Sequence, residues 1–158
     1  MGAIQPNTDY MIVNYNSGKA WAVKGENRDP GASVVQYSWE IDPDQYNQRW
    51  NFEQASNGWR ICVSPKFNGF YAVLDKDRAI TDNDAGVNVY PLQELSNGIW
   101  ALSSNQTGEW IAITNVASGK CCDVKGEGTD DDDWIVQYDP IAQAGQRWVI
   151  LEYGNWRP

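Results

Sequence analysis

Histidine is absent from the 158 residues of this chain, which removes the commonest general base and the commonest metal ligand. Every nucleophile that depends on Ser-His or Cys-His pairing is excluded with it. Basic residues are also scarce, because 12 Lys and Arg stand against 21 Asp and Glu, for a net charge of -9. Nucleic acid and anionic membrane surfaces are bound by clustered basic residues, so we expect neither partner. No apolar run approaches membrane-spanning length, and no membrane insertion is expected.

Cysteine is sparse, with Cys62, Cys121 and Cys122 only. An odd number of cysteines, two of them adjacent, is not the pattern of a disulfide framework, and a reducing compartment is the simpler interpretation. Residues 1–6 lack the basic start and the apolar stretch of a signal peptide. We therefore expect a cytoplasmic protein, with release by a route that needs no signal as the open alternative.

Aromatic residues, in contrast, make up 13% of the chain and include nine Trp, more than one small core requires. Their placement is periodic. The triplet Gln48-Arg49-Trp50 returns as Gln146-Arg147-Trp148, and a partial copy, Asn97-Gly98-Ile99-Trp100, lies halfway between. A period near 50 residues predicts repeated supersecondary units.

The third unit copies the first in more than this triplet. Ser118-Gly119-Lys120 repeats Ser17-Gly18-Lys19, and Val136-Gln137-Tyr138 repeats Val35-Gln36-Tyr37, each 101 positions later. The length suits one domain spanning residues 1–158. We divide it into repeats at about 8–55, 56–105 and 106–153.

Each repeat contains short strand-like segments, and no stretch shows a convincing 3.6-residue apolar period. Strands bounded by turn residues are expected at 10–13, 20–23, 34–37, 48–52, 59–63, 70–74, 87–90 and 100–102. Three such units cannot each bury a core alone, but around a three-fold axis they share one. We predict an all-β chain with the β-trefoil fold and with Trp50, Trp100 and Trp148 in its core.

The chain resembles the ricin B-type (QxW) lectin family over about residues 8–153. The resemblance rests on the two Gln-Arg-Trp triplets, the Ser-Gly-Lys turns and the Val-Gln-Tyr strands. It implies binding of galactose or N-acetylgalactosamine-type glycans at up to three shallow sites, one per repeat, without a metal or other cofactor. The residue types suit that chemistry, because an aromatic ring lies against the apolar face of a sugar while carboxylate and amide groups bind its hydroxyls.

Carried over to the third repeat, the resemblance implies a site made of Asp123, Tyr138 and Gln146. Strand alternation predicts that Asp123 points outward, away from the core. Gly145 precedes Gln146 where the family often has Asn, so one hydrogen-bonding group is missing there.

The first repeat keeps the aromatic and amide residues of the site, at Tyr37, Asn47 and Gln48. Ala22 stands at the carboxylate position, and two acidic residues of the following loop, Glu26 and Asp29, are the open substitutes. In the second repeat Val73 and Gly98 occupy the carboxylate and amide positions, so no working site is expected. We rank the third repeat first, the first repeat second and the second repeat last. For Gln48 and Gln146, hydrogen bonding to the backbone alone is the alternative role. For Asp123 the alternative is to fix the adjacent loop, and for Tyr37 and Tyr138 it is that of an ordinary amphipathic residue at the sheet edge.

The acidic run Asp130–Asp133 lacks the glycine and the spaced ligands of a calcium loop, so we expect a solvated loop and no metal site. Trp134 follows the run directly. It is expected either to rim the third-repeat site or to fold back onto the core.

The favoured function is a carbohydrate-binding lectin without catalysis. One shallow sugar site binds at around millimolar affinity, so useful avidity requires either two sites per chain or a homodimer. The alternative is a protein-binding trefoil, such as a protease inhibitor acting through loops 24–33 and 125–134. A glycosidase would need two carboxylates roughly 5–9 Å apart, and no motif marks such a pair, so no enzyme is expected.

Overall fold

The computed structural model describes residues 2–40, 44–74, 81–91 and 96–153. Within these ranges the chain has thirteen β-strands and no α-helix, which confirms the all-β prediction. The strands are β1 (Tyr10–Asn14), β2 (Ala20–Val23), β3 (Val34–Tyr37), β4 (Trp50–Ala55), β5 (Gly58–Val63), β6 (Tyr71–Leu74), β7 (Val87–Tyr90), β8 (Trp100–Leu102), β9 (Trp110–Ile111), β10 (Ile113–Asn115), β11 (Cys121–Val124), β12 (Ile135–Tyr138) and β13 (Trp148–Glu152). Short 3-10 turns lie at η1 (Lys24–Glu26), η2 (Ser96–Gly98), η3 (Lys125–Glu127) and η4 (Ala144–Gln146). No helix in these ranges is long and apolar enough to cross a membrane.

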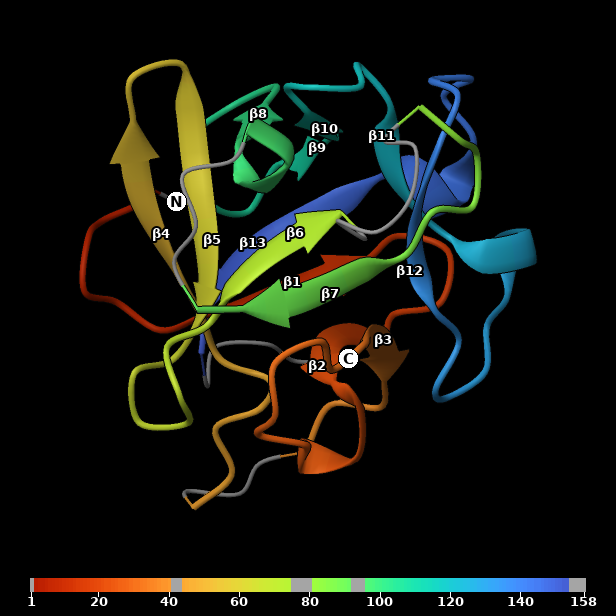
Figure 1. Ribbon diagram of the computed structural model, residues 1–158. Helices are drawn as coiled ribbons and strands as arrows, with labels where there is room; N and C mark the ends of the chain where they lie inside the picture. Colours follow the sequence, from red (N-terminus) through yellow and green to blue (C-terminus); the bar gives the residue numbers. More distant parts are fainter. Residues whose placement is uncertain (1, 41–43, 75–80, 92–95, 154–158) are drawn as a thin grey trace.

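A closed barrel takes strands from all three repeats (Figure 1). Hydrogen-bonded pairing runs in the order β13–β1–β4–β5–β8–β10, and β9 returns to β13 to close the ring. The first and last strands are paired along their lengths, from Tyr10 opposite Glu152 to Asn14 opposite Trp148. Because the ring is closed, the barrel strands present no free edge to another chain.

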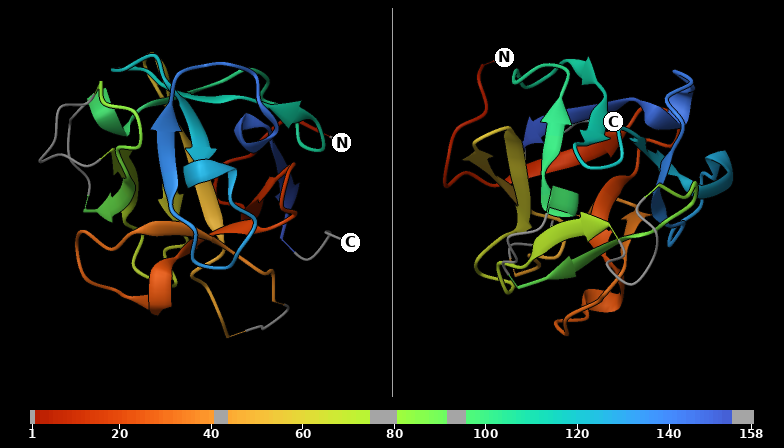
Figure 2. Two further views of the ribbon diagram at one scale, coloured as in Figure 1. Left: turned by 90° about the vertical axis from the view of Figure 1, so that its right-hand side faces the viewer. Right: turned by 45° about the horizontal axis from the view of Figure 1, so that its top comes forward.

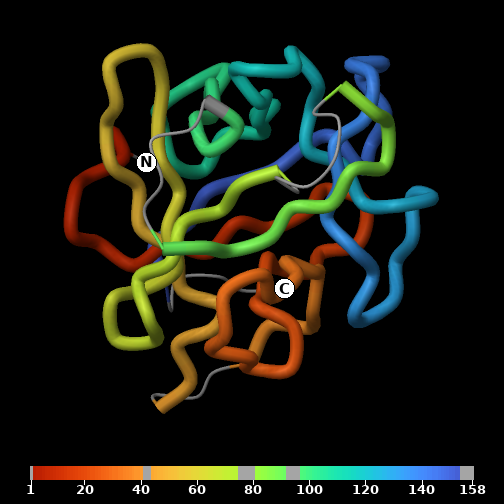
Figure 3. The backbone as a smooth tube through the Cα atoms, in the orientation of Figure 1, coloured from red at the N-terminus to blue at the C-terminus, as the bar shows by residue number. Residues whose placement is uncertain are grey.

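Three hairpins cap one end of the barrel, namely β2–β3, β6–β7 and β11–β12 (Figures 1 and 2). Single backbone bridges join each hairpin to its neighbours, at Ser33–Asn88, Val35–Trp134 and Gly86–Val136. Each repeat therefore gives two strand positions to the barrel and one hairpin to the cap, which is the β-trefoil predicted from the sequence. The backbone tube shows the three-lobed outline that this arrangement produces (Figure 3).

The repeated Ser-Gly-Lys and Val-Gln-Tyr segments are explained by a hydrogen-bond network that holds the hairpins in place. The Oδ1 atom of Asn14 accepts the N–H groups of Asn16 and Ser17 at 3.0 and 3.2 Å. The Ser17 hydroxyl in turn donates to Oε1 of Gln36 at 2.7 Å. The same bonds recur in the third repeat with Asn115, Ala117, Ser118 and Gln137. The segments that the two repeats have in common therefore stabilise the fold.

The repeated tryptophans Trp50, Trp100 and Trp148 are fully buried in the core, as predicted. Each indole N–H donates to a backbone carbonyl in the cap hairpin of its own repeat, with acceptors at Trp21, Ala72 and Cys122 and distances of 2.9, 3.0 and 3.2 Å. A buried indole N–H without an acceptor would cost free energy, so this bond fixes barrel strand and hairpin together.

The centre of the core departs from three-fold symmetry. Trp21 lies edge-on to Trp50 and Trp148, with ring centroids 5.4 and 5.9 Å away. The equivalent positions in the other repeats are the smaller Ala72 and Cys122, whose carbonyls accept the other two indoles. One large ring from the first repeat therefore fills space that three symmetric copies would overfill.

All three thiols are free and buried. Burial is the largest cause that raises the pKa of Cys62, to about 12, and burial likewise raises the pKa of Cys122 well above its usual range. Because the thiolate is the reactive form, neither side chain is prepared to act as a nucleophile.

We predict that Trp148→Phe lowers the free energy of unfolding by roughly 2 kcal/mol, because it removes the indole hydrogen bond and leaves a cavity in the core. Urea unfolding followed by far-UV circular dichroism measures the change. Trp110→Phe is the matched control, because Trp110 is 49% exposed. Equal losses in both variants would contradict the role given to the indole bond.

Candidate functional site

An open hollow of about 360 Å³ lies on the outer face of the first-repeat hairpin. Tyr37 at the end of β3 and Asn47, which precedes β4, both line it. Ala22 of β2 is also part of the lining. The structure thus brings together two of the three first-repeat residues predicted from the sequence, beside an alanine that occupies little space.

Asn47 presents a hydrogen-bonding group that the protein leaves unused. Its side chain is only 5% exposed, and its Nδ2 donates to the carbonyl of Val23 at 3.0 Å. Its Oδ1 has no hydrogen-bond partner among the described residues. The Oδ1 of Asn97, the equivalent residue of the second repeat, is unpaired as well, so the two repeats share this feature.

Gln48 lies behind the hollow and is not among its lining residues. It is 2% exposed, and its Nε2 donates to the carbonyls of Tyr37 and Ser38 at 3.5 and 3.1 Å. Its Oε1 accepts the N–H of Glu40 at 3.3 Å. The backbone role, which the sequence left open for this residue, is therefore the one it performs in the structure, and through it Gln48 positions Tyr37.

Acidic residues line the hollow, although β2 has Ala22 and no carboxylate at the position where the family has one. The lining includes Glu26, Glu40 and Asp132, with Lys24 as the basic residue among them. Of the two substitutes left open by the sequence, Glu26 lines the hollow and Asp29 does not. Asp132 belongs to the third repeat and was not considered for this site from the sequence.

The third-repeat residues are placed differently: Asp123 lies on the face away from the core, as alternation predicts, but it is buried there. It is only 1% exposed because the segment before β13 covers it. Its Oδ2 accepts the amides of Gln143 at 2.6 Å and Gln146 at 3.2 Å, and its Oδ1 accepts the N–H of Val124 at 2.8 Å. Asp123 and Gln146 therefore do meet, as predicted, but they bind each other.

Gln146 is saturated with partners inside the protein. Besides Asp123, its Nε2 donates to the carbonyl of Asp139 at 2.7 Å, and its Oε1 accepts the N–H groups of Ile141 and Ala142 at 3.1 Å each. The residue thus folds the 139–146 segment over Asp123. Tyr138 is half-buried on β12, on the same strand face as Asp123, since Cys121 pairs with Tyr138 and Asp123 with Val136.

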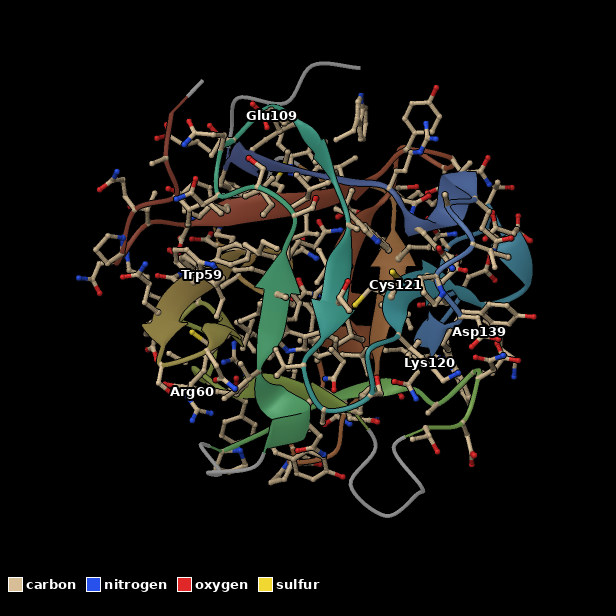
Figure 4. The ribbon with its side chains drawn as sticks, turned by 90° about the horizontal axis from the view of Figure 1, so that it is seen from above. Trp59, Arg60, Glu109, Lys120, Cys121 and Asp139 are labelled. Atoms are coloured by element: carbon tan, nitrogen blue, oxygen red, sulfur yellow. The ribbon has the colours of Figure 1, made fainter. Side chains whose placement is uncertain are left out.

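The rim of this third-repeat face is tied to the second repeat. Lys120 and Asp139 form an ion pair, and they lie side by side in Figure 4. Asn83 adds a hydrogen bond to the Asp139 carboxylate at 3.1 Å. The bonds from Lys120 and Asn83 lower the pKa of Asp139, so this carboxylate stays ionised and bound to its neighbours.

A second carboxyl, that of Glu127, packs against Asp123 where Gly145 leaves room. A side-chain carbon added to Gly145 would lie 2.3 Å from Oε1 of Glu127 and 2.5 Å from Oδ1 of Asp123. The other Glu127 oxygen accepts the N–H of Gly145 at 3.0 Å. Glu127 therefore occupies the space in which the family often places an asparagine side chain.

The pKa of the Glu127 carboxyl group is raised in this position. Desolvation and the hydrogen bond with Asp123 raise the pKa of Glu127 from 4.5 to about 7, against the opposing effect of the Gly145 N–H. As a carboxylate, Glu127 has an Oε1 atom without a partner, and as an acid it donates to Asp123. The environment beside Asp123 and Gly145 therefore favours the protonated form of Glu127.

The first repeat shows the opposite arrangement at the matching positions. Glu26 and Glu127 follow the same Gly in 3-10 turns of equal shape, with φ values of 53° and 54°. Glu26 is exposed, whereas Asn47 stands where the third repeat has Gly145. Where the asparagine side chain is present, the acidic residue of the turn, Glu26, stays exposed. Where glycine replaces it, the acidic residue, Glu127, packs against the strand.

In the second repeat Val73 is 3% exposed and Asn97 donates to the carbonyl of Leu74 at 3.1 Å, as Asn47 does to Val23. Gly98 lies at the glutamine position, and an added side-chain carbon there would meet Val73 at 3.0 Å. No carboxylate stands at the strand position of this repeat, and the absence of a working site there stays a prediction.

The acidic run is a structured loop. Trp134, which follows it, neither rims the third-repeat site nor folds back onto the core. Trp134 is 45% exposed, with the Lys125 ammonium 5.3 Å from its ring centroid. It lines a separate hollow of about 290 Å³, together with Ser33 and Asn88, and not the hollow of any predicted site residue. Within the described ranges no three acidic or cysteine side chains are placed to hold a metal ion.

Sequence reasoning missed Glu127, Gln143 and Asp132. The sequence shows that the third repeat has Gly145 where the first has Asn47. The contact between Gly145 and Glu127, however, forms between two loops that are brought together only by the fold. Four consecutive aspartates offer no signal that singles out Asp132.

Comparison with protein families gives one extensive match. The profile of the ricin-type beta-trefoil lectin domain-like family matches residues 3–91 and 96–157. No curated protein shows significant sequence similarity to the chain.

Solved structures share the fold over nearly the whole chain. A designed three-fold symmetric protein, ThreeFoil, superposes with a TM-score of 0.80 at 26% identity, covering 91% of this chain and 98% of its own. An exo-β-1,3-galactanase from Clostridium thermocellum gives 0.82 at 24% identity over 94% of this chain and 31% of that enzyme. A ricin B-like lectin of Macrolepiota procera, solved with lactose, gives 0.75 at 16% identity over 94% and 98%. The last two likenesses establish the fold alone.

We predict that Glu127→Gln flattens the pH dependence of stability. Because the folded-state pKa of about 7 lies above 4.5, the stabilisation by Glu127 is complete below pH 4.5 and is lost as the pH rises to about 7. The wild-type free energy of unfolding should therefore fall across this window, and fall less in the variant. Urea titrations at pH 4.5, 5.5, 6.5 and 7.5 measure both slopes.

Glu26→Gln is the matched control, because it removes one negative charge from the exposed equivalent residue. If both variants change the slope equally, loss of charge and not the Asp123–Glu127 contact is the cause.

Proposed function

Because the chain belongs to the ricin-type β-trefoil lectin domain-like family, we propose that it is a non-catalytic lectin that binds galactose or N-acetylgalactosamine-type glycans. Two proteins of the same fold support the sugar class: one acts on galactan and the other was solved with lactose, a galactose-containing disaccharide. The observation that carries the proposal is the first-repeat hollow, which Tyr37 and Asn47 line together with the acidic residues Glu26, Glu40 and Asp132.

The first-repeat hollow has the groups that a neutral hexose requires. The half-buried ring of Tyr37 offers an apolar surface for the C–H face of the sugar. The Oδ1 of Asn47 accepts a hydroxyl, and the surrounding carboxylates accept others. The hollow is open to solvent without rearrangement of the fold, so we place the principal site there, with Gln48 supporting Tyr37 from behind.

The third-repeat site, Asp123 with Tyr138 and Gln146, is proposed as a second site that is closed in the protonated form. Asp123 has its oxygens engaged by Gln143, Gln146 and Val124, and Glu127 fills the adjacent space. A sugar hydroxyl can reach Asp123 only when these partners withdraw. We thus rank the first-repeat site above the third-repeat site, which is the reverse of the ranking that the residue types alone favour.

Two sites per chain, or a homodimer with one site each, would supply the avidity that a shallow site lacks. A single site of this kind binds at roughly millimolar affinity, or about -4 kcal/mol. Joining two such sites in one particle raises the apparent affinity by about 10² or more when both reach the same glycan surface.

We predict that Tyr37→Ala removes most binding to galactose-type glycans, whereas Tyr138→Ala leaves it nearly unchanged at pH 6. Loss of the stacking surface is expected to weaken a millimolar site about tenfold, beyond detection on an array. A glycan array probed with wild type and both variants measures the difference.

Asp123→Ala, tested on the same array, discriminates between the sites. Loss of binding in that variant and in Tyr138→Ala, with Tyr37→Ala intact, would place the principal site in the third repeat and refute the proposed order. No binding of wild type to any glycan would refute the lectin function and direct attention to a protein partner, such as a protease tested by an inhibition panel.

We predict that Gly145→Asn opens the third-repeat site. The new side chain would displace the flexible end of Glu127, and its amide would find the Val124 carbonyl, as Asn47 finds that of Val23. Calorimetric titration with lactose should then give about twice the wild-type stoichiometry. An unchanged stoichiometry in a folded variant would show that Glu127 is not what closes the site.

A further inference from the structure

The acidic run of the third repeat is folded onto the first-repeat hairpin. The backbones exchange two hydrogen bonds of 2.9 Å, from Gln36 N–H to the Asp133 carbonyl and from Asp132 N–H to the Gln36 carbonyl. The Gln36 amide also donates to the carbonyls of Gly128 and Asp130 at 3.0 Å each. Figure 2 (left) shows the loop between β11 and β12 running down toward the first repeat. The position of this loop against the hollow is therefore fixed by backbone bonds.

Neighbouring carboxylates of the run act as structural groups. Asp131 accepts both the N–H and the hydroxyl of Ser38, at 2.7 and 2.8 Å. Asp133 accepts the Asp130 N–H at 2.9 Å and the Gln36 amide at 3.3 Å. Both side chains thus hold the loop in its shape.

Asp132 differs from these neighbours, because its carboxylate makes no hydrogen bond to the described residues. Its backbone adopts φ of 70°, a left-handed conformation that is uncommon outside glycine. The bridge between Val35 and Trp134 places Asp132 opposite Tyr37 across the two strands. Its side chain lines the same hollow as Tyr37 and Asn47.

We propose that Asp132 supplies the carboxylate of the first-repeat sugar site, in place of the one that Ala22 lacks, so that the site is built by two repeats. The proposal rests on the lectin function given above and adds the residue and the ligand class. A carboxylate in this position accepts hydroxyls of the sugar while Tyr37 supports its apolar face and Asn47 Oδ1 accepts a further hydroxyl.

The unpaired Asn47 oxygen lies beside the hollow, and Asn97 of the second repeat has an equivalent unpaired oxygen. The Asn47 oxygen belongs to a 95%-buried side chain, as its 5% exposure shows, and it owes nothing to the acidic run. A neutral ligand with several hydroxyl groups satisfies this oxygen and the Asp132 carboxylate together.

The pseudo-three-fold partners of Asp132 show that the carboxylate is not required by the fold. Gly31 and Asp84 occupy the equivalent loop positions, with φ values of 90° and 66°. Their N–H groups make the equivalent bonds, to the carbonyls of Val89 and Gln137. Glycine performs the backbone role in the loop that faces the second repeat, and aspartate performs it in the other two loops, since both residue types tolerate the left-handed conformation.

The charge around the hollow defines the ligand class. Three carboxylates, of Glu26, Glu40 and Asp132, face one ammonium, of Lys24. A sulfated or sialylated galactoside brings its own negative charge into this excess and is repelled. The proposed ligand is therefore an uncharged galactoside with free hydroxyls.

The test is calorimetric titration of wild type and Asp132→Asn with lactose and with 3′-sulfolactose. Asparagine tolerates the left-handed conformation, so the loop keeps its shape; thermal unfolding verifies this. Asp130→Asn is the matched control, because its side chain belongs to the same run and does not line the hollow. We expect lactose affinity to fall about tenfold in Asp132→Asn, which is about 1.4 kcal/mol, and to stay within about twofold in the control.

We also expect the ratio of the affinities for lactose and 3′-sulfolactose to be smaller in Asp132→Asn than in wild type. If wild type binds lactose and Asp132→Asn binds it as well as the control does, the assignment of Asp132 is overturned while the lectin function stands. If wild type binds neither sugar nor any other galactoside, the lectin function itself fails, and this inference falls with it.

Discussion

The hydrogen bond from each repeated tryptophan to a carbonyl of its own cap hairpin is the interaction on which the rest of the structure depends. Trp50, Trp100 and Trp148 each fill the core from a barrel position and reach into β2, β6 or β11 with the indole N–H. In the interior, where water cannot replace a lost partner, that bond is costly to break. It therefore fixes the hairpin relative to the barrel in every repeat. Because the tryptophans act on the inner face, the outer face of each hairpin is free to change without loss of the fold.

A second constraint joins the repeats to one another. The glutamines of the two Val-Gln-Tyr segments are fully buried, and each donates to carbonyls in a loop of another repeat. Gln36 donates to Gly128 and Asp130 of the third repeat, and Gln137 donates to Asp82 of the second. Each hairpin is thus packed against a loop that comes from elsewhere in the chain. The site on its outer face lies at a junction of repeats, which is why a residue of the third repeat lines the hollow of the first.

The outer faces show how repeats of one origin acquire different roles. The first and third repeats share their turns and their strand pattern, yet one has an open hollow and the other has a buried Asp123 with the half-buried Glu127 against it. The difference comes down to Asn47 against Gly145, because the asparagine side chain occupies the space that Glu127 takes in its absence. Under the proposed function, the first repeat would bind in the form seen here, whereas the third would bind only after the partners of Asp123 withdraw. The core packing does not depend on whether asparagine or glycine occupies this position, since all of these groups lie on the side away from the tryptophans.

The sequence by itself determined the fold, because a β-trefoil is encoded by local and periodic features: tryptophans near every fiftieth position, turn residues at fixed offsets and strands without helical period. It also indicated which residues surround the site, and Tyr37 and Asn47 do share a hollow. Only the tertiary structure decided whether those residues are available. Alternation along β11 placed Asp123 on the correct face, but alternation carries no information about the segment that folds over that face, and Gln143, Gln146 and Glu127 reach Asp123 from positions distant in the chain. The role of Asp132 likewise depends on the pairing of two repeats, a contact that no local pattern encodes.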